Sequence, residues 1–248
     1  MTNNPFNLVD KTILVTGASS GIGKAVAILC ASMGAHVIIT GRAENRLKET
    51  FALLNGDRHQ MVVADLTQPE SRDYLCTAVP ELDGIVHCAG IGHRKLCKAI
   101  TAEDIAKVMD ANFNASVLLQ SNLLSQKKIN RSASIVFLSS RTASVPTIAN
   151  SLYSASKGAL KSYAQCLALE LAPRGIRVNC ISPAMVWTPL ILQEGIAKED
   201  LIAEQTKYPL KRYGMPEDIA NLAVFLLSDA SSWMTGSCID ITGGSIEV

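Results

Sequence analysis

The sequence lacks the features that mark membrane, secreted and metal-binding proteins. No apolar run approaches the roughly 20 residues of a membrane span, and Met1–Pro5 carries no signal-peptide pattern. The seven cysteines never occur as C-x-x-C and the four histidines never as H-x-x-x-H, so neither a disulfide framework nor a metal site is expected. A formal net charge of +1 argues against nucleic acid or an anionic membrane as the main partner. These absences predict a soluble, cytoplasmic protein.

The chain does contain the material for one large core. Of its 248 residues, 48% are hydrophobic and 18% are charged. This length fits one α/β domain, and the composition gives no sign of disorder. We therefore predict a single domain over residues 1–248.

A glycine-rich turn lies between a strand predicted over Lys11–Thr16 and a helix predicted over Ile22–Met33. Strand, glycine-rich turn and helix in this order present backbone N–H groups and a helix N-terminus to a phosphate. Glycine also removes Cβ atoms where the backbone must approach a pyrophosphate. We favour a phosphate-binding loop over a plain turn, although the spacing is G-x-x-x-G-x-G and not the usual G-x-G-x-x-G. The turn consists of Gly17, Ala18, Ser19, Ser20, Gly21, Ile22 and Gly23.

The second predicted strand, His36–Thr40, ends at Gly41 and Arg42. NAD-binding βαβ units usually place an acidic residue near this point, where it binds the ribose 2′-hydroxyl. A guanidinium suits a 2′-phosphate by charge and by bidentate hydrogen bonding, so Arg42 favours NADP over NAD. The alternative is that Arg42 only caps an exposed turn.

Two more strands, His59–Ala64 and Gly84–Cys88, are predicted in the N-terminal half. The alternation of strands and helices implies a parallel sheet with its ligand at the carboxyl ends of the strands. Asp65 is placed there to accept from an adenine amino group, or else to cap the next helix. The residues that follow these two strands are Asp65, Leu66, Ala89 and Gly90.

Tyr153 and Lys157 are four residues apart, so they share one face of a helix predicted over Leu152–Leu171. A free phenol ionises near pH ~10, and a nearby ammonium lowers that pKa toward the range where acid–base catalysis is efficient. Ser140 ends a strand predicted over Ser134–Ser140, and its hydroxyl is placed to hold a substrate carbonyl. Alone, Tyr-x-x-x-Lys usually means a solvated lysine beside a half-buried tyrosine; the rest of the chain favours the catalytic interpretation instead.

The remaining segments complete an alternating pattern. Asn112 lies inside a helix predicted over Thr101–Lys127, where asparagine is unfavourable; it has either an interior role or a tolerated polar position. Two prolines and an uneven apolar pattern over 187–212 predict one or two helices that form a mobile substrate lid. The other predicted elements are the strand Arg177–Ile181, the helix Pro216–Leu227 and the strand Gly236–Ile241.

These elements together resemble the classical short-chain dehydrogenase/reductase family over essentially the whole chain. The resemblance implies a Rossmann fold with a doubly wound, seven-stranded parallel sheet, helices on both faces and usually a homotetramer or homodimer. It implies hydride transfer between a nicotinamide and a carbonyl carbon, with Tyr153 exchanging the proton, Ser140 orienting the oxygen, Lys157 lowering the phenol's pKa and Asn112 anchoring a water. The motifs that carry it are Thr16–Gly23, Asp65-Leu66, Ala89-Gly90, Asn112, Ser140, Tyr153-x-x-x-Lys157 and Pro183-x-x-Val186-x-Thr188.

By the same resemblance, the cofactor contacts follow from the matching positions. They are Gly17, Ser19, Ser20, Gly21, Ile22, Gly23, Arg42, Asp65, Leu66, Cys88, Ala89, Gly90, Tyr153, Lys157, Pro183, Val186 and Thr188. Two departures are visible: the family's Asn-Asn-Ala-Gly is here His87-Cys88-Ala89-Gly90, and its Pro-Gly is Pro183-Ala184. Neither departure removes a catalytic group.

Within the family the chain is most similar to bacterial 3-oxoacyl-[acyl-carrier-protein] reductases. Arg131 and Arg174 match positions at which those reductases dock the acidic carrier protein. The expected activity is therefore NADPH-dependent reduction of a ketone to a secondary alcohol. The alternatives are an NAD(P)-dependent dehydrogenase that oxidises a sugar, polyol or other secondary alcohol, and a nucleotide sensor without chemistry. A sensor has no need for the complete set of four catalytic groups.

Overall fold

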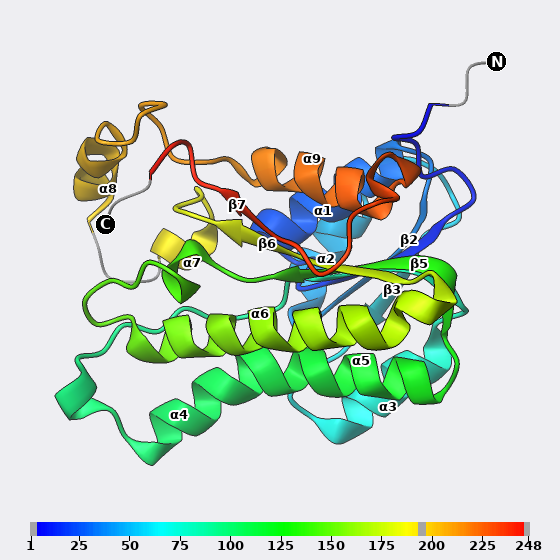
Figure 1. Ribbon diagram of the computed structural model, residues 1–248, viewed down its shortest axis with the longest axis horizontal. Helices are drawn as coiled ribbons and strands as arrows, with labels where there is room; N and C mark the ends of the chain where they lie inside the picture. The colour runs from blue at the N-terminus through cyan, green and yellow to red at the C-terminus, as the bar shows by residue number, and fades with distance from the viewer. Residues whose placement is uncertain (1–3, 193–196, 246–248) are drawn as a thin grey trace.

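Within the residues that the structure describes, 4–192 and 197–245, seven strands form one parallel sheet in the order β3-β2-β1-β4-β5-β6-β7 (Figure 1). The structure is a computed structural model. The order reverses between β1 and β4, which opens a crevice at the carboxyl ends of these two strands. The strands are β1 (Thr12–Thr16), β2 (His36–Gly41), β3 (Gln60–Val63), β4 (Leu82–His87), β5 (Ile129–Leu138), β6 (Arg177–Pro183) and β7 (Cys238–Ile241).

Helices cover both faces of this sheet (Figure 1). Buried residues of α1, α2 and α9 form one core layer, and those of α3, α5 and α6 form the other. The doubly wound α/β fold predicted from the sequence is confirmed. The helices are α1 (Gly21–Ser32), α2 (Glu44–Phe51), α3 (Pro69–Ala78), α4 (Ala102–Met109), α5 (Ala115–Ser125), α6 (Ser151–Leu171), α7 (Pro189–Leu192), α8 (Lys198–Gln205) and α9 (Pro216–Leu227).

The central strands are apolar without interruption because both of their faces are covered. Ile13, Leu14 and Val15 are all fully buried in β1. Ile13 and Val15 belong to the α1–α9 layer, whereas Leu14 belongs to the α5–α6 layer, as the two-residue period of a strand requires. Among the described residues, no helix is long and apolar enough to cross a membrane.

Two predicted boundaries were wrong for identifiable reasons. The helix predicted over Thr101–Lys127 is divided by a π-helical turn at Asp110–Asn114, the position of Asn112. The strand β5 begins at Ile129, five residues before the predicted Ser134, although the three residues after Ile129 are polar. The Arg174 guanidinium donates to the Ile129 carbonyl at 2.6 Å, and this long-range bond stabilises an extension that local sequence does not reveal.

The segment predicted as a lid contains α7 and α8, and residues 193–196 of it lie outside the described residues. Ile191, Leu201 and Tyr213 form a small separate core beneath these helices. The Trp187 indole N–H donates to the Gln205 side chain at 3.1 Å, which fixes the end of α8 to the segment after β6. Opening and closing of this segment stays a prediction.

Candidate active site

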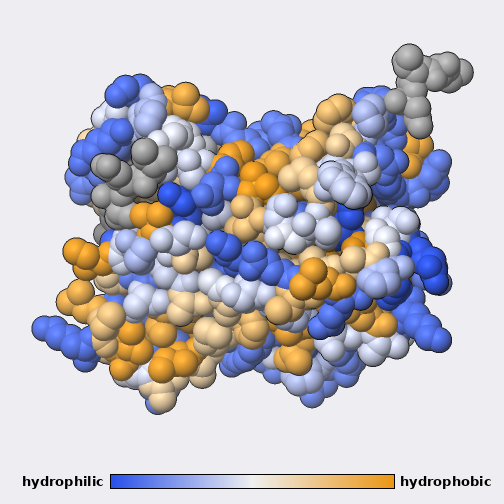
Figure 2. Space-filling model, viewed as in Figure 1, coloured by the Kyte–Doolittle hydropathy of each residue, from blue (hydrophilic) through white to orange (hydrophobic). Residues whose placement is uncertain are grey.

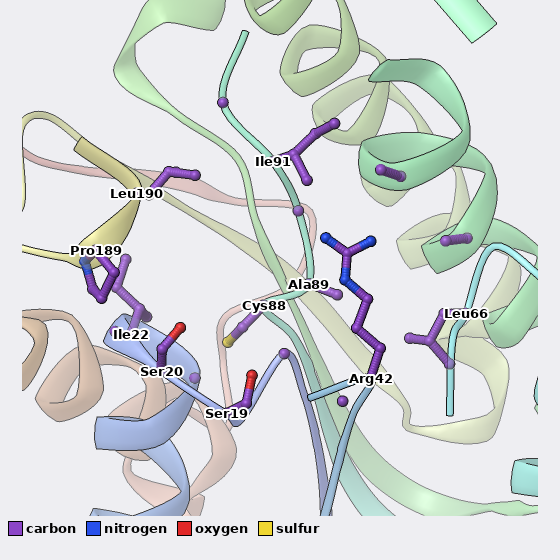
Figure 3. Close-up of a pocket in the computed structure, with 18 of the residues that line it drawn as sticks. Ser19, Ser20, Ile22, Arg42, Leu66, Cys88, Ala89, Ile91, Pro189 and Leu190 are labelled. Carbon is purple, nitrogen blue, oxygen red and sulfur yellow. The ribbon is translucent and has the colours of Figure 1, made fainter. Parts of the chain in front are cut away.

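The glycine-rich turn after β1 has the backbone geometry that its residues predict. Gly17 has a φ of +64°, and a Cβ built on it would lie 2.8 Å from backbone atoms of Ala89. A side chain at this position is therefore excluded twice, by conformation and by space. Gly21, also at positive φ, begins α1, so the helix N-terminus points at the same crevice. In Figure 3 the Ser19 and Ser20 hydroxyls project into the cavity above this turn.

The turn forms one wall of a cavity of about 540 Å³ at the carboxyl ends of β1, β2 and β4. The Arg42 side chain extends across this cavity toward Ala89 (Figure 3), and Arg46 from α2 also lines it. Thirteen predicted cofactor contacts line it: Gly17, Ser19, Ser20, Gly21, Ile22, Gly23, Arg42, Asp65, Leu66, Cys88, Ala89, Gly90 and Thr188.

The Asp65 side chain accepts hydrogen bonds within the turn that follows β3. Its Oδ1 accepts from the backbone N–H of Thr67 at 3.0 Å and from the Thr67 hydroxyl at 2.8 Å. Burial opposes ionisation, but these bonds and the charge of Arg42 hold the pKa of the carboxyl below its usual range. These bonds close a turn before α3, whose N-cap is Gln68 without a side-chain cap, so they do not make Asp65 the cap of that helix. The side chain lines the cavity, and its contact with an adenine amino group stays a prediction.

The altered motif after β4 is braced by a residue that sequence reasoning missed. The Thr16 hydroxyl oxygen accepts from the backbone N–H groups of both Cys88 and Ala89, at 3.1 and 3.2 Å. His87 stacks on Phe137 with 4.5 Å between ring centroids, and burial lowers its pKa to about 4. The neutral imidazole of His87 and the thiol of Cys88 thus occupy the two positions where the family has asparagine, and Thr16 holds the backbone that follows.

The other departure is also accommodated. Ala184 is outside the set of described residues with positive φ, and its N–H donates to the Ile241 carbonyl at 3.1 Å. Because this position does not use the left-handed region, alanine replaces glycine here without backbone strain.

Asn112 holds the loop after β4 through its side chain. It is fully buried, its Oδ1 accepts from the Ile91 N–H at 2.7 Å and its Nδ2 donates to the Ile91 carbonyl at 3.0 Å. The same Nδ2 donates to Ser156 at 3.1 Å, and the Ser156 hydroxyl donates to the Tyr153 carbonyl at 2.7 Å. These bonds connect the first turn of α6 to the wall of the cavity. The predicted water at Asn112 stays a prediction.

Lys157 is buried between the two halves of the site. Its Nζ donates to the Leu138 carbonyl at 2.8 Å and lies 5.8 Å from the centroid of the Tyr153 ring. A Cβ on Gly90 would lie 3.4 Å from this Nζ, so the glycine leaves room for the ammonium. Burial lowers the pKa of Lys157 to about 8, while the neighbouring Cys88 and Cys180 oppose that shift.

Ser140, Tyr153 and Lys157 line a second cavity of about 830 Å³ under α7 and α8. The Ser140 hydroxyl oxygen, nearly buried, accepts from the Thr142 hydroxyl at 3.0 Å. Pro183 and Val186 line this cavity, and both cavities share a wall made of Ile22, Cys88, Gly90, Ile91, Arg94, Thr188 and Leu190. The structure thus brings every predicted catalytic group to one place, with Asn112 behind the wall.

Comparison with known proteins agrees with this geometry. A family model described as enoyl-(acyl carrier protein) reductase matches residues 17–245. A 3-oxoacyl-[acyl-carrier-protein] reductase of Rickettsia felis is 36% identical over 98% of this chain and 100% of its own. An NAD-dependent glycerol dehydrogenase of Listeria innocua is 33% identical over 96% of this chain and 95% of its own. A solved NAD(P)-dependent gluconate 5-dehydrogenase of Beutenbergia cavernae, with NADP bound, has a TM-score of 0.87, 31% identity and coverage of 97% and 98%.

The chain belongs to the short-chain dehydrogenase/reductase family. It is therefore an oxidoreductase that acts on CH–OH groups with a nicotinamide cofactor. The residues present fit that cofactor, since the site provides a backbone cradle at Gly17, a helix N-terminus and three guanidinium groups on one cavity.

Several groups at this short-chain dehydrogenase site were not predicted. Arg46 could have been found, because it follows Arg42 by four residues and lies in the first turn of an amphipathic helix. Thr16 belongs to the motif Thr16–Gly23, but its role, like that of Ser156, depends on bonds to atoms far along the chain that no local signal indicates. Arg94 lines both cavities from the loop after β4, a position that becomes evident only in three dimensions.

Lys157 should make the stability of this dehydrogenase depend on pH in a defined way. Between its folded pKa of about 8 and its unfolded pKa near ~10.4, the unfolded chain holds a proton that the native site releases. The free energy of unfolding therefore gains from Lys157 as pH rises through this window, by roughly 3 kcal/mol at most. We expect the free energy of unfolding, measured with urea from pH 7 to 10.5, to rise for wild type relative to Lys157→Met. Lys161→Met, one turn further along α6, is the matched control. If the difference in unfolding free energy between wild type and Lys157→Met does not change with pH, burial does not lower the pKa of Lys157.

Proposed function

We propose that this short-chain dehydrogenase is an NADPH-dependent reductase that converts the ketone of a 3-oxoacyl thioester to a secondary alcohol. The observation that carries the substrate class is the apolar lining of the second cavity. Its walls include Leu138, Val145, Met185, Val186, Ile191 and Leu201 around the hydroxyls of Ser140 and Tyr153. Such a wall gains free energy by burying an acyl chain and offers little to the hydroxyls of a polyol.

The surface around this cavity supports the same class. Leu96, Ile148 and Leu192 are 50%, 81% and 49% exposed, although all are large apolar side chains. Figure 2 shows apolar patches at the left end of the molecule, the end at which Figure 1 places α4, α7 and α8. Apolar residues exposed at this end favour contact with an apolar ligand or partner there.

The preference for NADPH is supported by two of the three arginines that line the first cavity. Arg42 follows β2, at the place where an NAD site carries a carboxylate, and Arg46 lies one helical turn further on. Within the described residues, neither guanidinium takes part in an ion pair at hydrogen-bonding distance. Both therefore remain available to a phosphate dianion.

The chain's own residues account for the proton side of the reaction. The Ser140 hydroxyl donates to the substrate oxygen and orients the carbonyl beside Tyr153. Tyr153 gives its phenolic proton to that oxygen, and the Lys157 ammonium stabilises the phenolate that remains. The bound dinucleotide supplies the hydride to the carbonyl carbon. Asn112, through its bonds to Ile91 and Ser156, fixes the position of the cavity wall relative to the helical turn that carries Tyr153.

A second candidate is the oxidation of a polyol or another secondary alcohol. Asp200, Glu204 and Lys207 line the far side of the same cavity and provide polar partners for substrate hydroxyls. The similarity to a glycerol dehydrogenase also supports this candidate.

The experiment that separates the two candidates is a substrate panel with purified protein. We expect NADPH oxidation with 3-oxoacyl thioesters of coenzyme A or N-acetylcysteamine, and kcat/KM that rises with acyl length. Turnover of sugars or polyols with NAD, and none of the thioesters with NADPH, would reverse the assignment.

We also propose the acyl carrier protein as partner, in a homotetramer or homodimer in a reducing cytoplasm. All seven cysteines are free thiols, which suits that compartment. Arg131 is exposed near the start of β5, whereas Ser140 follows its end, roughly 30 Å away for ten strand residues. A carrier at Arg131 and Arg174 would therefore serve the site of a second copy. Arg131→Ala should slow carrier-bound thioesters and leave coenzyme A thioesters unaffected.

A further inference from the structure

Two cysteines that the proposed reaction does not use are partners across neighbouring strands. Cys180 in β6 is paired in register with Cys238 in β7, the edge strand of the sheet. Strands lie about 4.8 Å apart, which is inside the Cα separation of roughly 4.4–6.8 Å that a disulfide spans. Both side chains pack on the α6 side of the sheet, and each thiol is the largest influence on the pKa of the other.

The two thiols differ in the way that a reactive pair requires. Cys180 is 1% exposed and its pKa is raised, first by its bond to Cys238 and then by burial. Cys238 is half-buried, and the bond from Cys180 lowers its pKa to about 7, with help from the Lys161 charge and from Ser182. A partly accessible thiolate beside a protonated second thiol is the arrangement of redox-responsive cysteines.

The other cysteines lack either a reactive thiol or a neighbouring cysteine in register. Burial raises the pKa of Cys30, Cys76 and Cys88, which makes them unreactive. Cys97 and Cys166 are exposed, and neither is the register partner of a cysteine in the described sheet.

We propose that Cys180 and Cys238 are an oxidation site, at which a hydroperoxide converts the two thiols to an intrachain disulfide. The Cys238 thiolate attacks the peroxide, the O–O bond breaks, and a sulfenic acid forms as water or an alcohol leaves. The Cys180 sulfur then attacks that sulfenic sulfur, the S–S bond forms and water leaves. Two electrons pass from the sulfurs to the peroxide, and any dithiol reductant reverses the step.

This disulfide would affect the catalytic residues, which lie near the carboxyl ends of the strands. Cys180 lies close enough to Lys157 for their charges to interact, and Asp240, two residues after Cys238, pairs with Arg141 at 2.8 Å. Arg141 directly follows Ser140. Drawing the sulfurs to about 2.05 Å changes the packing beneath Lys157 and shifts β7, so turnover falls on the order of tenfold.

The test is peroxide treatment of the whole protein, followed by thiol titration and peptide mass spectrometry. With the oxidised protein unfolded in denaturant for the titration, we expect titratable thiols to fall from seven to five, since two are consumed, with a Cys180–Cys238 crosslinked peptide that dithiothreitol removes. Cys238→Ser should abolish this loss and Cys166→Ser should retain it. Cys180→Ala should stop at a sulfenic acid on Cys238 that dimedone traps, and Cys238→Ser decides the matter if Cys180→Ala does not fold.

Oxidation confined to Cys97 or Cys166, or disulfides only between chains, would overturn the proposal. The thiol and mass readouts need no substrate, so they test the pair even if the proposed reductase function is wrong. The tenfold effect rests on that function and is measured separately, as turnover before oxidation, after it and after reduction. Unchanged turnover of the crosslinked protein would overturn the coupling to Lys157.

Discussion

Tyr153→Phe should reduce turnover by about 10²–10⁴-fold, which is the contribution of a positioned acid–base group. The substitution removes one oxygen atom and keeps the ring that lines the second cavity. The groups predicted to hold the dinucleotide phosphates line the first cavity and remain unchanged. We therefore expect NADPH to bind with an unchanged Kd while the ketone is no longer reduced. Nucleotide fluorescence and a stopped-flow assay measure the two quantities on the same sample.

Tyr163→Phe is the matched control for this experiment. Tyr163 lies on the same helix, partly buried, with its ring edge-on to Phe137 at 5.8 Å, and it lines neither cavity. Its loss of a hydroxyl should leave turnover within about twofold, as for a substitution away from the reacting atoms. If Tyr153→Phe keeps more than a tenth of wild-type turnover, the proton comes from another group. If wild type itself binds NADPH and reduces nothing, the nucleotide-sensor hypothesis gains support.

Arg42→Ala should weaken NADPH binding by about 10–100-fold, because a charge-assisted hydrogen bond contributes roughly 1.5–3 kcal/mol. NADH carries no 2′-phosphate, so its Kd should stay nearly constant. Arg46→Ala should act in the same direction with a smaller effect, because Arg46 approaches from the helix and not from the strand end. Isothermal titration with both nucleotides at two salt concentrations gives the result, and the NADPH effect should shrink at high salt.

Arg58→Ala is the control for a general loss of positive charge. Arg58 is exposed just before β3 and does not line the first cavity. It should leave both nucleotide affinities unchanged. An equal loss for NADPH and NADH in Arg42→Ala would mean that Arg42 supports the shape of the cavity and does not bind the 2′-phosphate.

Much of this molecule could be predicted because its signals are local. The apolar runs before Gly17, Arg42 and Gly90 mark strand ends, and the sheet brings those ends together. The helix Pro216–Leu227 was predicted to the residue, since a proline at its first position and a capping aspartate, Asp218, define its start.

The features that were missed depend on pairs that only the fold brings together. Thr16 braces residues more than seventy positions away, and the bond that extends β5 comes from Arg174, in the turn after α6. The π-helical turn around Asn112 follows from bonds to Ile91 and Ser156, not from propensity. The Cys180–Cys238 pair requires knowledge of which strand lies at the edge of the sheet.

The wall shared by the two cavities has a kinetic consequence. Ile22, Cys88, Gly90 and Thr188 face both spaces, so what occupies the first cavity becomes part of the floor of the second. A substrate that binds before the nucleotide contacts an incomplete pocket, whereas one that binds after it contacts the complete pocket. We therefore expect an ordered mechanism, in which the nucleotide binds first and leaves last. In steady-state terms, product inhibition by NADP should be competitive with NADPH, and the alcohol product should not be competitive with NADPH.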